Sequence, residues 1–531
     1  MFGLHAFSEA PFSALLEGQQ IQAEELTIRF ASKSFATRGD DTPAHIFFDG
    51  RLMSGLTIGR RLTAGPDGQF GSLIEATFGE IELANHDGGL NSLIQAYYAD
   101  GRQIRVKIGA TEIFGGRERV KNYTSFATVY SAVAGDWSIE GDSVRLRVAT
   151  LASRLQDRLQ SQTYAGSGGV QGTEDMTGRT VPTAFGRCLN VPAQVLDPTV
   201  LTFDLHGGPL DSITAVYDAG IALGLDVDYA TYDELATSSV LDGEYSSCLA
   251  AGKIKLGLAP TGSVTADIQG DNQLFDARGY TDEHGGVMKK ILMNYSDLVD
   301  SQIDLASFDA LDVLQPASMG LFLPAGDQST IEQVLEQIAF SCGAFVGQDR
   351  SGLYRVQRLD APAANQHWTF TDRELLDLRQ ERLPYRIPWK SWGIGYQRNW
   401  TTQTGTDLAG GVTQERRAFL EAEYRYVYAQ EPNIALQHFT SSGAPLVSSL
   451  FIDKTVAETE AQRRIALYGL GRAYYRVIVP TALFSVEIGQ TVRLISNKYG
   501  LTAGRNCVVV SIDDDAGSDT KLATTEMLVF G

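Results

Sequence analysis

Seven histidines are the first residues to test for metal or acid–base chemistry, and their spacing speaks against both. The chain contains neither an HExxH nor an HxH pattern, so the ligand pair of a metallopeptidase is not predicted. His86 falls in a polar turn and His206 precedes two glycines, so we expect both to be solvated turn residues. The full set is His5, His45, His86, His206, His284, His367 and His438.

A glycine-rich stretch could in principle cradle a phosphate group. Its glycines are Gly166, Gly168, Gly169 and Gly172. A phosphate loop also needs a strand before it, a helix after it and a Gly-Lys-Ser/Thr sequence, and the pattern here predicts none of these. We therefore interpret this stretch as a flexible loop.

An acidic run near the C-terminus could bind a hard cation. The segment VSIDDDAGSDT holds Asp513, Asp514, Asp515 and Asp519, but it lacks the spacing and the closing glutamate of an EF-hand. The favoured interpretation is a charged, exposed hairpin loop. Paired carboxylates for sugar hydrolysis stay open as an alternative, because 64 acidic residues allow many pairings.

No nucleophile with a visible base and no GxSxG occurs in the sequence. The four cysteines, Cys188, Cys248, Cys342 and Cys507, form no CxxC pair. We expect buried, reduced thiols, with a metal site built from all four as the alternative. The sequence thus predicts a protein that is not an enzyme, with no catalytic residue, no metal and no cofactor.

Length and charge limit the remaining classes of function. With 531 residues the chain exceeds one core, so several domains are expected. A net charge of −20 disfavours a nucleic-acid footprint and anionic membranes. The first residues lack a basic leader, and no apolar run approaches the length of a membrane span, so we expect neither a signal peptide nor a spanning helix.

The elements that would position any site are mainly short strands. Alternation predicts strands over 24–32, 81–83, 104–108 and 144–148, and Asp49-Gly50 predicts a hairpin turn. Helical spacing of Leu90, Leu93, Ile94 and Tyr97 predicts a short helix packed on a sheet between two of these strands.

Farther along, Pro260-Thr261-Gly262 predicts another hairpin. The clearest helix is expected over 331–342, capped by Ser329 or Thr330 and ended by Gly343. A hairpin through residues 349–352 follows, and a further helix is expected over 455–470. Three strands joined by turns and a last C-terminal strand then indicate a small β-barrel or sandwich.

These patterns predict a mainly β fold with α+β parts, built as several β-barrel or sandwich domains with short packing helices. We expect an N-terminal arm that packs on the body or on a neighbour, then a first β-barrel-like domain, a Gly/Ser-rich linker loop, a β-rich domain, an α+β domain and a C-terminal β-barrel-like domain. The corresponding ranges are 1–20, 21–155, 156–185, 186–285, 286–365 and 366–531.

Four segments together resemble one family, the central tail hub proteins of siphophages and prophages. GEIELANHDGGLNSLIQAYYADGRQIRVKIG is similar to a strand, turn and "GRxIxVKxG" segment of these proteins, and TYAGSGGVQGTEDMTGRTVPTAFGRCLNVPAQVLD to the segment that follows. STIEQVLEQIAFSCGAFVGQDRSGLYRVQRL resembles their helix-hairpin, and SVEIGQTVRLISNKYGLTAGRNCVVVSIDDD their C-terminal β domain. The resemblance spans roughly residues 45–530 and is carried by a pattern rather than by an invariant motif.

The resemblance implies a structural hub at the tail tip or baseplate of a long-tailed bacteriophage, similar to the trimeric hub of contractile-tail baseplates. It implies tail-tube-like β-barrel domains in each subunit and a homotrimeric ring that joins the tail tube to tip proteins and lines the channel for DNA ejection. Implied partners are distal tail and tube proteins, the tape-measure protein and tip or fibre proteins, without stable DNA or membrane binding. The location implied is the virion tail, after assembly in the host bacterial cytoplasm.

Some relatives carry an iron–sulfur cluster on clustered cysteines, and others a muralytic domain. The cysteines of this chain are widely spaced and no muralytic segment is evident, so neither is carried over. Two alternatives stay open: a tail-associated cell-wall or glycan hydrolase, and a receptor-binding or carbohydrate-binding tail protein.

Overall fold

Strands dominate the computed structural model, which describes residues 2–8, 26–54, 57–64, 69–114, 117–150, 154–381, 388–480, 486–515 and 523–531. The expectation of a mainly β fold with several sheets and a few helices is confirmed. The sheets formed by the described residues are open, and none closes into a barrel. Among these residues, no helix is long and apolar enough to cross a membrane.

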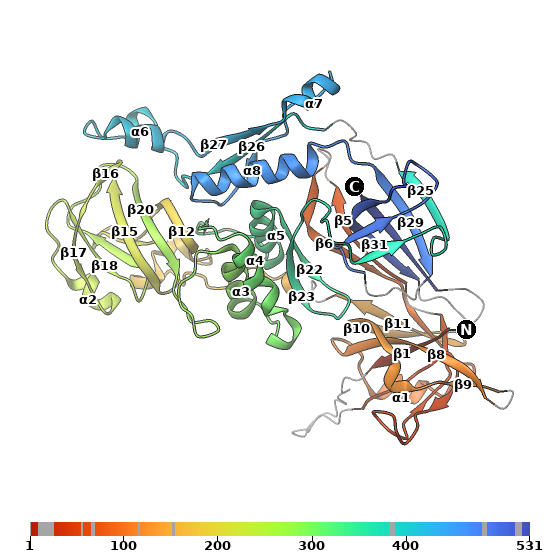
Figure 1. Cartoon of the computed structure of the whole chain (residues 1–531). Helices are drawn as coiled ribbons and strands as arrows, with labels where there is room; N and C mark the ends of the chain where they lie inside the picture. Colours follow the sequence, from red (N-terminus) through yellow and green to blue (C-terminus); the bar gives the residue numbers. More distant parts are fainter. Residues whose placement is uncertain are drawn as a thin grey trace.

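The N-terminal part is built on a seven-stranded sheet with the order β1-β8-β10-β11-β7-β4, in which β9 pairs with β8 (Figure 1). Residues 2–8 of the expected arm pack on the body as β1, antiparallel to β8; residues 9–20 lie outside the described residues. The elements of this part are β1 (Phe2–Ser8), β2 (Phe35–Ala36), β3 (Phe47–Phe48), β4 (Leu52–Ser54), β7 (Ile81–Ala84), α1 (Asn91–Ala96), β8 (Gln103–Phe114), β9 (Arg117–Val120), β10 (Ala127–Glu140) and β11 (Ser143–Ala149).

The short helix α1 forms where the sequence predicts it. Leu90 is buried just before its first turn, and Leu93, Ile94 and Tyr97 pack against the core of this sheet. The side chain of Asn85 fixes the preceding turn, because its Oδ1 accepts a hydrogen bond from the backbone N–H of Leu90 at 2.9 Å. The helix thus covers part of the sheet and carries no site.

Two predictions in this part are wrong. The expected strand over 24–32 is reduced, in its described residues, to the isolated bridge positions Arg29 and Phe30, and Phe30 pairs with Asp49. Asp49-Gly50 does not close a hairpin, because the strand before it, β3, pairs with β2, and the strand after it, β4, pairs with β7. Alternation and turn residues report local geometry, but they do not report which strands pair.

The middle part holds two five-stranded sheets, β16-β15-β20-β12-β21 and β13-β14-β19-β18-β17. The expected hairpin at Pro260-Thr261-Gly262 is wrong, because this turn leads from β19 in one sheet to β20 in the other. The elements are β12 (Thr183–Pro192), β13 (Gln194–Asp197), β14 (Thr202–Asp204), β15 (Leu210–Asp218), β16 (Ile221–Ala222), β17 (Gly224–Asp228), α2 (Tyr232–Thr237), β18 (Glu244–Cys248), β19 (Lys253–Leu256), β20 (Val264–Asp271) and β21 (Gly320–Leu323).

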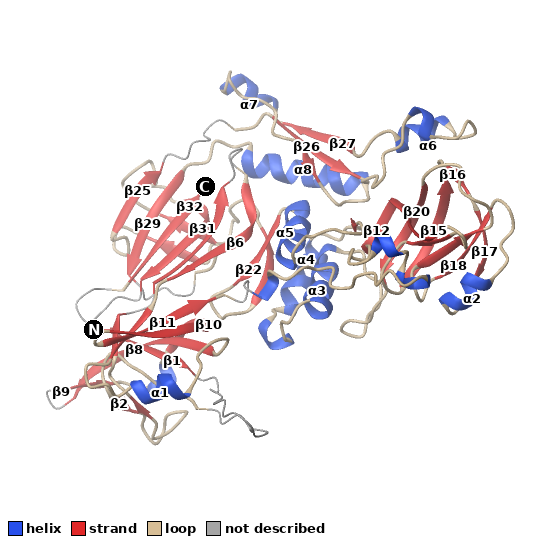
Figure 2. Cartoon of the chain, turned by 180° about the vertical axis from the view of Figure 1, so that it is seen from behind, coloured by secondary structure: helices blue, strands red, loops and turns tan. Residues whose placement is uncertain are grey.

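Three helices, α3 (His284–Tyr295), α4 (Leu305–Leu314) and α5 (Ile331–Cys342), stand between the middle sheets and the rest of the chain (Figure 2). The prediction for α5 is confirmed in detail. The side chain of Thr330 accepts a hydrogen bond from the backbone N–H of Gln333, which completes a capping box. Gly343 ends the helix in the left-handed conformation, with φ of 67°. The apolar stripe of α5 lies in the largest core cluster.

A ten-stranded sheet joins segments from across the chain. Its main path is β23-β22-β6-β5-β31-β32-β29-β25, and β30 links β24 to β31. The sheet therefore unites strands that the sequence assigns to three separate domains, and the expected domain division stays a prediction. The strands are β5 (Thr57–Ala64), β6 (Phe70–Phe78), β22 (Ala344–Gln348), β23 (Tyr354–Arg358), β24 (Trp368–Phe370), β25 (Asp377–Glu381), β29 (Tyr474–Pro480), β30 (Thr491–Leu494), β31 (Arg505–Asp515) and β32 (Thr524–Phe530).

A small three-stranded sheet, β27-β26-β28, lies along one side of the molecule with α8 packed beneath it (Figure 1). The side chain of Trp392 from β26 is fully buried and stacks on Tyr468 of α8, with ring centroids 5.1 Å apart. The elements are β26 (Ser391–Tyr396), α6 (Gln414–Leu420), β27 (Arg425–Gln430), α7 (Pro432–Gln437), β28 (Val447–Ser448) and α8 (Lys454–Tyr468).

Candidate functional site

The two histidines singled out by the sequence differ in their exposure to solvent. His86 is exposed in its turn, as expected. His206 is only 2% exposed, so the expectation of a solvated turn residue is wrong. His206 lies close to Gln160 and to Tyr295, the last residue of α3. Nδ1 of the His206 imidazole accepts a hydrogen bond from the backbone N–H of Ala184 at 3.1 Å.

A network of buried charges surrounds His206. Two aspartates form its centres, and each is held by a lysine and a tyrosine. The Asp204 carboxylate lies 2.7 Å from Nζ of Lys253 and accepts a hydrogen bond from the hydroxyl of Tyr164 at 2.6 Å. The Asp271 carboxylate lies 3.6 Å from Nζ of Lys290 and accepts a hydrogen bond from the hydroxyl of Tyr295 at 2.9 Å.

His206 and Tyr295 line a small cavity of about 40 Å³, and the two Asp–Lys pairs lie outside its lining. Nε2 of His206 has no hydrogen-bond partner among the described residues and lies 3.9 Å from Oδ1 of Asp271, beyond hydrogen-bonding distance. Burial opposes ionisation of Asp271, but His206 and Lys290 outweigh it and lower the pKa of the carboxyl. The cavity has room for a few water molecules and is far smaller than a typical ligand pocket.

The glycine-rich stretch is irregular, as expected, and the residues on either side of it are anchored in a small apolar core. Gly166, Gly168, Gly169 and Gly172 all have positive φ. The side chains of Tyr164 and Met176 on either side of these glycines are each 2% exposed and share a small core with Leu196. The turns Gly169–Gln171 and Glu174–Met176 are short 3-10 helices, and no strand-to-helix phosphate loop is formed by these described residues.

The acidic run is not an exposed loop, so that expectation is wrong for its described part. Asp513, Asp514 and Asp515 belong to β31, and alternation along the strand turns only the middle one inward. The Asp514 carboxylate is 2.7 Å from Nη1 of Arg350 and accepts a hydrogen bond from Oγ1 of Thr525 at 2.6 Å. Asp519 lies outside the described residues.

All four cysteines are free and buried, as the sequence predicts. Burial raises the pKa of the Cys342 and Cys507 thiols to about 12 and also raises those of Cys188 and Cys248. Among the described residues, no three side chains of His, Cys, Asp or Glu are grouped so that they could hold a metal ion.

Two further ion-pair clusters join distant segments, and sequence reasoning missed both. In the first, Glu487 binds Arg60 of β5 at 2.6 Å and Arg350 of the β22–β23 turn at 3.2 Å. Burial opposes ionisation of Glu487, but the charges of the two arginines lower its pKa. Because Arg350 also binds Asp514, one guanidinium connects the β22–β23 turn to β31 and to the segment before β30.

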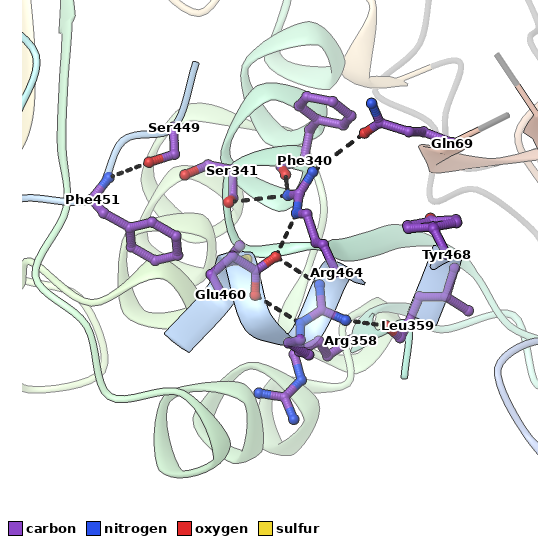
Figure 3. Close-up of polar contacts among 12 residues, drawn as sticks. Gln69, Phe340, Ser341, Arg358, Leu359, Ser449, Phe451, Glu460, Arg464 and Tyr468 are labelled. Carbon is purple, nitrogen blue, oxygen red and sulfur yellow. Dashed lines mark hydrogen bonds and ion pairs between the residues drawn. The ribbon is translucent and has the colours of Figure 1, made fainter. Parts of the chain in front are cut away.

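The second cluster is centred on Glu460 of α8 (Figure 3). Its carboxylate lies 2.6 Å from Nε of Arg464 and 2.7 Å from Nε of Arg463. Arg464 also donates hydrogen bonds to the backbone carbonyl oxygens of Phe340 and Ser341 at the end of α5 (Figure 3). Burial opposes ionisation of Glu460, but the two arginines lower its pKa. The helical spacing of apolar residues predicts α8, but it gives no sign of a buried acid on the same face.

Comparison with known proteins adds likenesses in structure alone. No protein-family model matches the chain, and no curated protein matches it in sequence. A tail protein from Neisseria meningitidis is similar over 92% of this chain and 93% of its own, with 10% identity and a TM-score of 0.36. A 43 kDa prophage tail protein from Shewanella oneidensis is similar over 91% and 93%, with 11% identity and a TM-score of 0.34.

An Escherichia coli component of the type VI secretion system is similar over 90% of this chain and 73% of its own, with 7% identity and a TM-score of 0.29. That protein exhibits structural similarity to T4 bacteriophage tail proteins. These similar structures are phage tail proteins and a tail-related protein, the class that the sequence resembles. At these TM-scores the likeness carries no argument about function.

Proposed function

We propose that this chain is a structural subunit of the tail tip or baseplate hub of a long-tailed bacteriophage. In this role three copies form a ring that joins the tail tube to tip proteins and surrounds the channel for DNA. The observation that carries the proposal is the use of the buried charges: in the clusters described above they bind one segment of the chain to another and do not converge on a cavity of substrate size.

Three carboxylates with little exposure illustrate this use. Glu487, in the segment before β30, binds Arg60 of β5; Asp514 of β31 binds Arg350 in the β22–β23 turn; and Glu460 holds the arginine that binds the end of α5. An active site instead needs charged groups aimed at a space that a substrate can enter. A scaffold braced between distant segments suits a part that transmits load within an assembly.

Net charge supports the same role. At −20 the chain repels phosphate, so a lumen lined by its acidic residues would let DNA pass without adhering. We propose distal tail and tube proteins, the tape-measure protein and tip or fibre proteins as its partners, with assembly in the host cytoplasm before incorporation into the virion. A mainly basic lumen in an imaged ring would contradict the proposed passage of DNA.

Light scattering coupled to size-exclusion chromatography, with electron microscopy of the same fraction, tests the proposal. We expect the mass of three chains and a ring with a central opening. A monomer at every concentration tested would overturn the proposed ring. Peptidoglycan zymography and a glycan array applied to the same sample test the alternatives: clearing of the gel would favour a hydrolase, and specific retention would favour a glycan-binding protein.

A further inference from the structure

The outer face of the β27-β26-β28 sheet is rich in exposed apolar side chains. Tyr426 and Tyr428 of β27 are 38% and 59% exposed, and Leu446, next to β28, is 50% exposed. Gly393 of β26 lets two of these side chains lie across the sheet. A Cβ atom at this position would lie 2.9 Å from Cε1 of Tyr428 and 2.5 Å from Cδ2 of Leu446.

Two more large apolar residues follow directly after β27. Leu436 in α7 is 73% exposed, and Phe439 just beyond it is 94% exposed. We call this group of five the β27 region; its members are Tyr426, Tyr428, Leu436, Phe439 and Leu446. Their exposed area is on the order of 600 Å², given about 200 Å² for a large side chain, which is at the upper limit for an apolar patch on a monomer. One side of a stable interface buries about 800 Å², so this region is large enough to supply most of one side.

A second uncovered surface lies at the end of the middle sheets. All five residues of β17 are exposed, and among the described strands β17 pairs only with β18. Leu225 and Val227 project from it with 57% and 43% exposure, and Leu241 and Leu258 nearby are 68% and 57% exposed. A strand that is open along one edge and uncovered on both faces is a site where another chain can add a strand. We call these four residues and the strand the β17 edge.

We propose that the β17 edge of one copy of this chain pairs with the β27 region of the next copy. This inference rests on the proposed ring and names the surfaces that form it. Strands β17 and β27 have similar lengths, five and six residues, and among the described strands each pairs along one edge only. Leu225 and Val227 are exposed apolar residues of β17, on either side of a register shift that lies between Leu225 and Asp228. In the proposed contact they would pack on Tyr426 and Tyr428 as pairs of apolar and aromatic residues.

The position of the two surfaces favours contact between copies. β17 lies at one end of the molecule, and β27 lies between α6 and α7 above α8, nearer the middle, in both views (Figures 1 and 2). One copy therefore presents the two halves of the contact in different places. A contact between two different surfaces repeats head to tail, and it closes into a ring when the rotation between copies allows.

Disulfide cross-linking tests this contact. The native cysteines are buried, so only the introduced thiols are expected to form disulfides. In a chain that carries both Val227→Cys and Tyr428→Cys, mild oxidation is expected to give covalent trimers. Chains with one substitution each, assembled together, are expected to give covalent dimers and nothing larger, because each subunit then contributes one thiol. A chain with Ile113→Cys and Tyr428→Cys is the control, since Ile113 is 82% exposed but lies outside both surfaces.

A second variant measures the contribution of the β27 region without cross-linking. Phe439→Ser is expected to raise the concentration at which the trimer dissociates by at least tenfold, as seen by light scattering. Tyr499→Ser is its control, because Tyr499 is 46% exposed outside both surfaces, and it is expected to leave that concentration unchanged.

The outcomes separate the two proposals. The proposed contact is overturned if trimers form normally, cross-link no better through Val227 and Tyr428 than through the Ile113 control, and tolerate Phe439→Ser. That result would leave the hub proposal intact. A wild-type chain that stays monomeric would overturn the hub proposal, and this contact with it. A ladder of ever larger covalent products would contradict closure into a ring.

Discussion

Glu460 and Arg464 lie one turn apart on α8, and Oε1 of Glu460 accepts a hydrogen bond from Nε of Arg464 at 2.6 Å. Both side chains are at most 3% exposed. Arg464 continues to the carbonyl oxygens at the end of α5, so this contact connects two helices that are more than one hundred residues apart in sequence. The stability of the junction should therefore depend on a single carboxylate.

We predict that Glu460→Ala destabilises the protein by about 3 kcal/mol, because it leaves the buried guanidinium of Arg464 without its counter-charge. Arg463 is partly exposed and keeps Asp360 as a second partner. Thermal unfolding should show an earlier transition for this part of the chain. Glu458→Ala on the same helix is the control, since Glu458 is half-exposed and pairs only with Lys454, and it should change stability by less than about 1 kcal/mol. Equal shifts for the two variants would contradict a special role for Glu460.

Gly343 should tolerate alanine less well than another glycine with positive φ. A Cβ atom at Gly343 would lie 1.8 Å from Nη2 of Arg463 and 2.7 Å from Oε1 of Glu460, so Gly343→Ala must displace the ion pair. At Gly405, with φ of 51°, a Cβ atom would meet nothing within 4 Å. We expect Gly405→Ala to cost about 1 kcal/mol through backbone strain alone and Gly343→Ala clearly more. Chemical denaturation of both variants measures the difference, and a smaller cost at Gly343 would contradict the described packing.

The helices were more predictable from sequence than the sheets. For α5, the cap at Thr330, the apolar stripe and Gly343 all act within one segment, so local patterns suffice. The turn at Pro260-Thr261-Gly262 was also predicted, but its role was not, because partners of β19 and β20 lie elsewhere in the chain. Strand pairing depends on contacts between distant residues, which alternation does not encode.

The buried ion pairs could not be predicted from the sequence either, because their partners are also distant along the chain. Asp514 sits in a run of three aspartates that suggests solvent, and its partner Arg350 lies 164 residues earlier. The alternation of Val508, Val510 and Ile512 could have been extended to place Asp514 on the inward face of β31. His206 offered no such signal, because the segments that cover it are remote in sequence.

Asp312 of α4 predicts a pH dependence of stability. Its carboxylate is buried and accepts hydrogen bonds from the backbone N–H groups of Gly285 and Gly286, at 2.6 and 2.7 Å, in the first turn of α3. Burial raises its pKa to about 7; the negative charges of Glu283 and Asp309 add to this effect, and the two hydrogen bonds oppose it. The folded protein thus binds this proton more tightly than the unfolded chain does.

The contribution of Asp312 to stability is therefore fully present below about pH 4 and is lost as the pH rises to about 7. We expect Asp312→Asn, which carries no charge at any pH, to remove this loss. Relative to wild type, the variant should gain on the order of 4 kcal/mol between pH 4 and pH 8. Denaturant unfolding at both pH values measures it, and parallel pH profiles for the two proteins would contradict the raised pKa.

The four thiols should be unreactive in the native protein. Cys188, Cys248, Cys342 and Cys507 are each fully shielded from solvent, and burial raises the pKa of every one, so little thiolate is present or accessible near neutral pH. Titration with a coloured disulfide reagent should detect less than one thiol per native chain at pH 8 and four in strong denaturant. Rapid reaction of a native thiol would show local opening at that cysteine, and separate labelling of each Cys→Ser variant would identify which core opens.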